Sequence, residues 1–323
     1  MMRYLTSIFS ICIMMLFCQC SNTLAPYRAE ENLLVGVPAM DAPRPKGAEV
    51  SVTFLGVNSY LIRSASTTLL IDPYYSRVPL RKVVFHAPIA PSHEANAYAI
   101  RHGAIPNRVD GILITHSHFD HFLDGPYLQQ RLRGKLITSR TGQFLAEASG
   151  VSRGHLLPST HGDRYRIGEA TIRVERSFHD KVMGSLPWPG LITEPLSEPP
   201  NDVRDWKLGT PLAYLIELHG KTIYIESGGT RDHLPHLGSV DLAILGTAVA
   251  PTRERYPEVV RNLSPRFVLP SHQDSLFAPI DAGFQFTPLA NFPQIRAFHQ
   301  SEELALPGRL ILMDHFHTWM IPD

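Results

Sequence analysis

The chain has 323 residues with 44% hydrophobic content, enough to fill a sizeable core in one or two domains, and this excludes a disordered chain. Lys plus Arg and Asp plus Glu both number 30, so the sequence has no excess of positive charge for nucleic acid. The sixteen histidines are many for this length. Several of them follow apolar runs, where loops carry chemistry.

The first residues are typical of an export signal. Arg3 precedes a largely apolar run over 8–17, which is shorter than the ~20 residues that a transmembrane helix needs. The leader resembles that of bacterial lipoproteins, in which a cysteine at the cleavage point is lipidated. Cys20 is the best candidate for that cysteine, and Cys18 is the alternative. We therefore expect an exported protein, periplasmic or on the outer membrane, held at the membrane through a lipid on Cys20.

Cleavage without lipidation stays open. The residues before Cys20 are a poor match to the small residues expected there, so a secreted soluble protein cleaved after Ala25 is the alternative. Domain boundaries are expected at 1–20 for the signal, 21–48 for a proline-bearing tether and 49–323 for the folded domain. All three cysteines precede that domain, so its metal ligands must be His, Asp or Glu.

The folded part begins with strands and continues as alternating strands and helices. Residues 188–206, rich in proline and tryptophan, are interpreted either as a lid over a pocket or as a packed surface loop. Two similar halves predict two sheets packed face to face with helices outside. Strands are predicted at 50–55, 60–62, 68–71, 112–114, 135–138, 170–174, 211–217, 222–226, 240–245, 266–269 and 309–313, and helices at 122–132, 141–148 and 254–262.

The stretch 115–125, Thr-His-Ser-His-Phe-Asp-His-Phe-Leu-Asp-Gly, places four potential metal ligands directly after the predicted strand 112–114. His116 and His118 are two residues apart, so in an extended segment their rings lean to the same side and can bind one cation. Asp120 is expected to cap the following helix, while His121 enters its first turn and points towards a second cation. A solvated histidine-rich turn is the alternative, but the full spacing after a strand favours metal binding.

His179 and His272 each follow a predicted strand as well, so these segments can end at the same edge of a sheet sandwich. Together with His116 and His118, His179 would complete a three-histidine site with an open fourth position for water. That arrangement lowers the pKa of bound water to about 7. A second site would comprise Asp120, His121 and His272.

The order and spacing of these residues resemble the metallo-β-lactamase superfamily, whose His-x-His-x-Asp-His motif stands here at 116–121. The resemblance covers nearly all of 49–323. Within the superfamily it points to the branch of ascorbate-6-phosphate lactonases and N-acyl phosphatidylethanolamine-hydrolysing phospholipase D, on the Leu-Ile-Asp-Pro at 70–73 and the Pro-Ser-His at 270–272. It implies an α/β fold, a four-layered αββα sandwich of two mixed sheets with outer helices. It also implies that Asp72 hydrogen-bonds a ligand histidine.

One position departs from the family pattern. The family has Gly-Asp-Thr after the strand that stands here at 222–226, and its Asp bridges two metals, whereas this chain has Gly229 at that place. The second metal thereby loses a ligand, and less negative charge offsets two close dications. Glu226 and Asp232 are candidate substitute ligands. A site with one metal and a site without activity are the alternatives.

The resemblance implies a metal-dependent hydrolase in which metal-bound hydroxide attacks a phosphodiester, lactone or other ester, with Asp120 as the candidate catalytic carboxylate. The expected cofactor is zinc, as one or two ions, with manganese or iron as alternatives. A small-molecule or lipid-like substrate would suit an enzyme tethered to a membrane. The competing hypothesis is a catalytically impaired surface lipoprotein that keeps the fold and binds a metal or another ligand. A redox role with iron is less favoured because no flavin-binding domain is appended.

Overall fold

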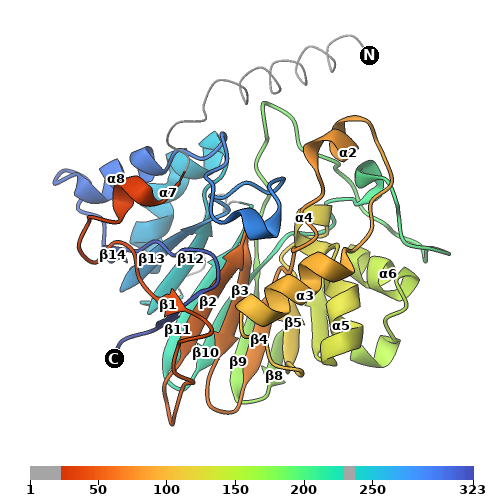
Figure 1. Cartoon of the computed structure of the whole chain (residues 1–323), viewed down its shortest axis with the longest axis horizontal. Helices are drawn as coiled ribbons and strands as arrows, with labels where there is room; N and C mark the ends of the chain where they lie inside the picture. The colour runs from red at the N-terminus through yellow and green to blue at the C-terminus, as the bar shows by residue number, and fades with distance from the viewer. Residues whose placement is uncertain (1–22, 229–236) are drawn as a thin grey trace.

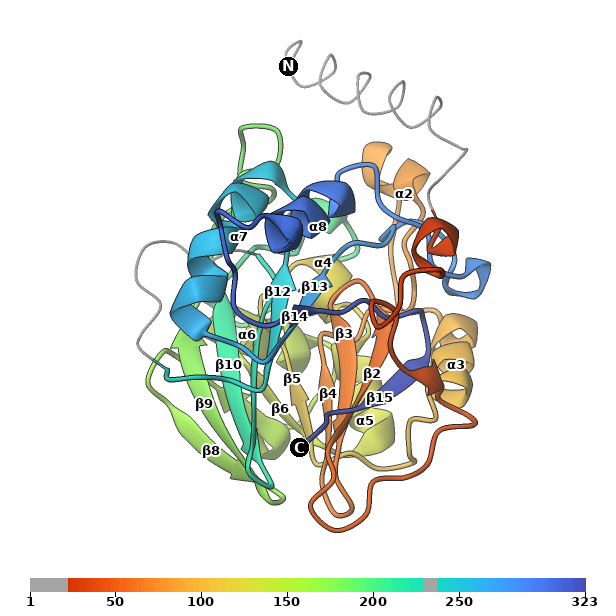
Figure 2. The same ribbon diagram turned by 90° about the vertical axis from the view of Figure 1, so that its left-hand side faces the viewer.

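The computed structural model describes residues 23–228 and 237–323. Two mixed sheets lie face to face, with α3, α5 and α6 outside the first and α7 and α8 beside the second (Figures 1 and 2). The predicted sandwich of two mixed sheets with outer helices is therefore confirmed. The helices are α2 (Leu80–Val84), α3 (His93–His102), α4 (Phe119–Phe122), α5 (Gly125–Leu132), α6 (Arg140–Ala148), α7 (Ala250–Leu263) and α8 (Phe292–Gln300).

The first sheet has eight strands, antiparallel at one side and parallel at the other. Its parallel part consists of short, largely apolar strands, of which β5 is buried along its whole length, as expected where both faces of a sheet are covered. Its strands, in spatial order, are β1 (Val37–Pro38), β15 (His317–Met320), β2 (Ser51–Gly56), β3 (Ser59–Arg63), β4 (Thr68–Ile71), β5 (Gly111–Leu113), β6 (Lys135–Thr138) and β7 (Leu156–Pro158).

The second sheet has seven strands, and its inner face shares one apolar core with the first sheet. A second apolar cluster lies between the first sheet and its helices. The core thus has two layers, and polar residues at the ends of the strands are left to build a site. The strands, in spatial order, are β14 (Arg309–Leu310), β13 (Phe267–Ser271), β12 (Leu242–Gly246), β11 (Lys221–Glu226), β10 (Leu212–Leu218), β9 (Ala170–Arg176) and β8 (Arg164–Ile167).

The helix predicted over 122–132 is two helices, α4 and α5, with a break between them. Pro126 lies in the first turn of α5, where its missing N–H costs nothing, so a new helix begins at Gly125. Asp120 consequently lies inside α4 and does not cap the following helix, which corrects that prediction. Asp124, at the break, accepts hydrogen bonds from the backbone N–H groups of Tyr75 and Ser76.

Part of the expected tether is packed on the domain. Leu24 and Leu33 are buried in the core between the sheets, Leu34 bridges to Leu312, and β1 pairs with β15. The prediction of a tether over 21–48 is therefore wrong for 24–39. This segment is polar overall, but its few apolar side chains are enough to pack it against the edge of the first sheet. The expected signal, with Cys18 and Cys20, lies outside the described residues. Among the described helices, none combines the length and the apolar character needed to span a bilayer.

Candidate metal centre

The two predicted ligand groups meet at one end of the sandwich, where several strands end. The motif 116–121 follows β5, His179 follows β9 and His272 follows β13. Within each group the potential ligand atoms all lie within 4.8 Å of one another. The groups that the structure brings together are His116, His118 and His179 in the first, and Asp120, His121 and His272 in the second.

Backbone carbonyls orient two rings of the first group. His179 Nδ1 lies 2.8 Å from the carbonyl oxygen of Asp180, and His118 Nε2 lies 3.0 Å from that of Pro187. A carbonyl only accepts, so these nitrogens carry the protons and the opposite ring nitrogens carry lone pairs. His118 therefore offers Nδ1 and His179 offers Nε2 to the centre.

His116 is oriented by hydroxyl groups. Its Nδ1 lies 3.1 Å from Ser227 Oγ, which in turn lies 2.7 Å from Thr115 Oγ1. Its Nε2 faces His118 Nδ1 at 3.1 Å. The three rings of the first group thus aim one nitrogen each at a common point.

In the second group, one carboxylate oxygen approaches two imidazoles. Asp120 Oδ2 lies 3.3 Å from His272 Nε2 and 3.5 Å from His121 Nε2. His121 turns its other nitrogen to Asp72 Oδ2 at 2.9 Å. The buried Nδ1 of His272 has no hydrogen-bond partner among the described residues.

Asp72 is fully buried and holds the two groups together. Its Oδ1 accepts the backbone N–H of Thr115 at 2.7 Å. Its Oδ2 accepts from Asn58 Nδ2 at 2.8 Å and Thr115 Oγ1 at 2.5 Å, besides its contact with His121. The contact between Asp72 and a motif histidine, implied by the family resemblance, is thus present, and the same carboxylate also fixes the start of the motif.

The protonation states suit a cation. Burial lowers the pKa of His116 well below its ordinary value, and burial with the neighbouring His179 lowers the pKa of His118 to about 3. Burial alone would raise the pKa of Asp120, but His121 and His272 outweigh it and hold that pKa below its usual range. Neutral His116 and His118 beside ionised Asp120 are donors that zinc prefers when no cysteine is available. Burial alone would lower the pKa of His121, but Asp120 and Asp72 outweigh it and raise that pKa, so a cation in the second group would take the place of the proton on this ring. The residues present therefore fit a divalent metal.

The expected substitute ligands are not in the two groups as described. Glu226 lines a small cavity with Thr252 and Arg255 of α7, because successive side chains of β11 point to opposite faces and Ser227, the next residue, is the one that reaches His116. Gly229, where the family has its bridging Asp, and Asp232 lie outside the described residues, as do His233 and His236.

The proline-rich insertion contacts the motif directly. The ring of Trp188 stands edge-on to those of His118 and Phe119, with centroids 5.7 and 5.4 Å away. Its backbone carbonyl accepts from the N–H of Leu208, and Trp206 is buried against the second apolar cluster. The insertion is thus a packed loop whose first part borders the metal centre.

The sequence analysis did not assign roles to Ser227, Asp180 or Arg255. Asp180 is buried, forms an ion pair with Arg255 of α7, and donates its backbone N–H to the carbonyl of Gly228 at 2.9 Å. These contacts hold Asp180 in place, and its backbone carbonyl orients His179. Ser227 directly follows a predicted strand, which was the available sign, whereas no local pattern indicates that Asp180 and Arg255 meet.

Two mixed sheets in a sandwich, with two histidine-rich groups at the ends of the strands, define a chain of the metallo-β-lactamase fold. The chain belongs to the beta-lactamase superfamily domain family, whose model matches residues 51–272.

Curated relatives are similar over most of their length. A UPF0173 metal-dependent hydrolase of Desulforamulus reducens is 25% identical over 235 residues, which is 70% of this chain and 85% of that protein. One of Pelotomaculum thermopropionicum is 26% identical over the same shares.

Solved structures share the fold. Igni18, a metallo hydrolase from Ignicoccus hospitalis, has a TM-score of 0.55 at 17% identity and covers 85% of this chain and 99% of its own. CmlA, a diiron beta-hydroxylase from Streptomyces venezuelae, has a TM-score of 0.53 at 14% identity and covers 87% of this chain and 55% of its own. At these identities the likeness concerns the fold only.

Proposed function

We propose that this metal-dependent hydrolase of the metallo-β-lactamase superfamily cleaves an ester-type bond in a phosphodiester, a lactone or another ester. The observation that carries the proposal is the convergence of three neutral imidazoles beside a second group with an ionised carboxylate. A divalent cation held there lowers the pKa of a water molecule and polarises the oxygen of a substrate. The names of the curated relatives support the same reaction class.

Each residue has a definite task in this proposal. His116, His118 and His179 would hold the first cation through the ring nitrogens that their hydrogen bonds leave free. Asp120 keeps its carboxylate ionised, so its oxygens can accept a hydrogen bond from the attacking water and orient it. The zinc ion expected from the donor set, or manganese or iron in its place, is part of the proposal.

The residues that follow His179 in the chain motivate the proposal of a partly apolar substrate. Between His179 and the middle of the insertion, large apolar side chains are exposed: Met183, Leu186 and Leu191, by 58%, 38% and 60%. Trp188 in the same segment contacts His118. An aromatic ring against a metal ligand, in a segment with exposed apolar side chains, suits a hydrophobic ligand, so we propose a lipid-like or otherwise apolar ester. The lactonase and phospholipase branch stays a prediction.

The test compares two histidine variants on a panel of phosphodiesters, lactones and carboxylic esters. His116→Ala removes a ring from the centre, whereas His161→Ala removes an exposed ring that lies 3.5 Å from Glu175. We expect His116→Ala to abolish every hydrolysis that the wild type performs and His161→Ala to leave it unchanged. Equal rates in the two variants would refute the proposal.

A second candidate function rests on Gly229. If the missing bridging carboxylate has removed catalysis, the protein is a metal- or ligand-binding surface protein. This alternative predicts bound metal without turnover of any substrate in the panel. Hydrolysis that is lost in His116→Ala would decide against it.

We further propose that the chain is exported and anchored by a lipid on Cys20, on the pattern of its leader. Growth with a radiolabelled fatty acid tests this. Label should be incorporated in the wild type and in Cys18→Ser and lost in Cys20→Ser. Absence of label in the wild type would favour the secreted soluble form.

A further inference from the structure

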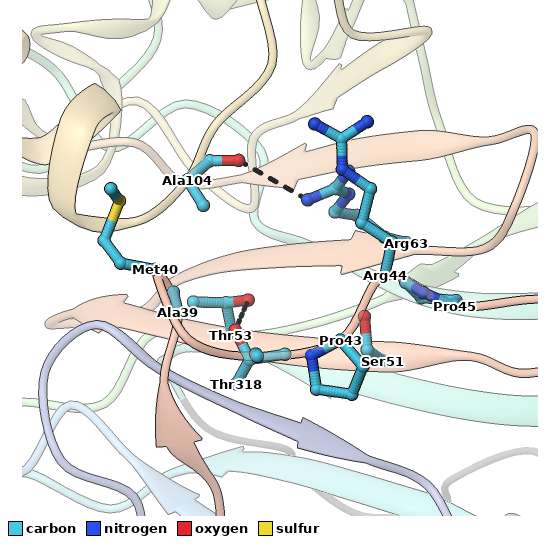
Figure 3. A pocket seen from close by; sticks show the side chains of 11 residues that line it. Ala39, Met40, Pro43, Arg44, Pro45, Ser51, Thr53, Arg63, Ala104 and Thr318 are labelled. Carbon is cyan, nitrogen blue, oxygen red and sulfur yellow. Dashed lines mark hydrogen bonds between the residues drawn. The ribbon is translucent and has the colours of Figure 1, made fainter.

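A polar pocket lies on the outer face of the first sheet, away from the metal centre. It has a volume of about 230 Å³, and Figure 3 shows residues 39–45 running across strands β2, β3 and β15 to enclose it. Ser51, at the floor, begins β2, whereas Val57 at the other end of that strand accepts the backbone N–H of His272. Six residues of strand separate the two ends by about 20 Å. The pocket is therefore a separate feature of the fold.

Two arginines meet at this pocket without a carboxylate. Arg63 ends β3, Arg44 comes from the segment above it, and Figure 3 shows both guanidinium groups on the same side of the pocket. Among the described residues, neither arginine forms an ion pair with an acidic side chain. Burial and the charge of Arg44 both lower the pKa of Arg63. Two like charges, one half-buried on Arg63 and one exposed on Arg44, thus lie at the same pocket with no acidic partner among the described residues, and an anion between them would relieve their repulsion.

The same pocket holds unused hydrogen-bond donors. Arg63 donates from Nη1 to the carbonyl of Ala104 at 3.4 Å, but its buried Nε has no partner among the described residues. Ser51 is 1% exposed, and its Oγ likewise has no described partner. Cross-strand pairing places Ser51 directly opposite Arg63 on the sheet face. A buried hydroxyl and a buried guanidinium N–H without partners are what an oxyanion would satisfy.

We propose that this pocket binds the phosphate group of a small soluble molecule, with Arg44 and Arg63 as its charge partners and Ser51 as a hydroxyl donor. A phosphate carries about −1.5 to −2 charges at neutral pH, which matches two guanidinium groups, whereas a carboxylate carries one. The hydroxyls of Thr53 and Thr318, 2.7 Å apart at the pocket wall, supply further polar contacts. A bound phosphate also joins residues 39–45 to the sheet.

The experiment is isothermal titration of the purified full chain, stripped of metal with a chelator, with inorganic phosphate and separately with acetate. Removal of the metal prevents phosphate from binding to a cation at the metal centre, so any remaining binding occurs elsewhere. We expect one phosphate per chain, with affinity lowered about tenfold or more in Arg44→Gln and Arg63→Gln. Arg131→Gln, which changes an exposed arginine of α5, and His116→Ala should bind phosphate as the wild type does.

Arg44 is exposed, so Arg44→Gln carries little risk to folding and keeps the test decisive. Without phosphate this variant should unfold at the same or a higher denaturant concentration, because it removes an uncompensated charge. With phosphate, the wild type should gain stability and Arg44→Gln should gain less. Three results would overturn the proposal: no phosphate binding by the wild type, equal binding by Arg44→Gln, or acetate binding as tight as that of phosphate.

Discussion

Asp72→Asn tests whether a single buried carboxylate sets the geometry of the metal centre. The wild-type side chain accepts one hydrogen bond at Oδ1, from Thr115 N, and three at Oδ2, from Asn58, Thr115 Oγ1 and His121 Nδ1. Asparagine has one oxygen, so an NH₂ group must face at least one of these donors. If the asparagine oxygen takes the place of Oδ2, the NH₂ group faces the Thr115 N–H, which is left unsatisfied. In the other orientation, the NH₂ group faces the imidazole of His121.

The first orientation is the less costly, because it loses one acceptor and keeps the other three contacts. An unsatisfied buried N–H costs about 1–3 kcal/mol, so we expect the free energy of unfolding to fall by that amount. The partner of His121 Nδ1 also changes from a charged carboxylate to a neutral amide. Loss of such a hydrogen-bond partner behind a metal ligand typically lowers metal affinity about 10- to 100-fold. The effect on metal should concern the group of Asp120, His121 and His272.

Two assays separate these effects. Urea denaturation of the metal-free chain gives the change in stability, and competition with a chromophoric chelator gives the affinity for zinc. Asp281→Asn, at an exposed position, is the control and should change neither quantity. If Asp72→Asn lowers stability but leaves zinc affinity at every site unchanged, the role assigned to Asp72 in orienting His121 is wrong.

Further predictions concern the surroundings of the centre. Ser227→Ala removes the hydroxyl 3.1 Å from His116 Nδ1 and should weaken zinc binding about tenfold in the same chelator competition. Burial alone would raise the pKa of Asp274, but Arg77, 3.0 Å away, helps to hold it well below the usual range. Its carboxylate therefore stabilises the fold above about pH 4, and this contribution is lost as pH falls through the folded-state pKa. Asp274→Asn should lower the free energy of unfolding by about 3–5 kcal/mol at pH 7, and by less below pH 4 in urea titrations at both values. Gly229→Asp should raise the number of zinc ions per chain towards two. An unchanged number would show that a carboxylate at position 229 does not contribute to binding a second metal.

The arrangement of the candidate ligands could be predicted because their signal is local. His116 and His118 are fixed by spacing after a short apolar strand, and His179 and His272 by their position directly after strands. β5 belongs to the first sheet and β9 and β13 to the second, and all three end at the same end of the sandwich, so residues that directly follow these strands come together there. The structure brings these residues into the two expected groups.

The features that sequence reasoning missed depend on contacts between distant segments. Asp180 meets Arg255, and Leu34 meets Leu312, only because the fold places their elements side by side. No helix was predicted at α3, because prolines lie on both sides of it in the sequence, although Ser92 accepts the N–H of Ala95 and caps it. Local propensity indicates where turns, strands and helices lie along the chain, but it does not show which of these elements pack against each other in the fold.

Metal content tests the central claim most directly. The chain is purified without chelator, dialysed, and analysed by inductively coupled plasma mass spectrometry beside a variant carrying His118→Ala and His121→Ala, which removes a ring from each group. The account predicts at least one zinc, manganese or iron ion per wild-type chain and a clear loss in the variant, with both proteins folded by circular dichroism. A wild type without metal, or a variant that retains the full metal content, would contradict it.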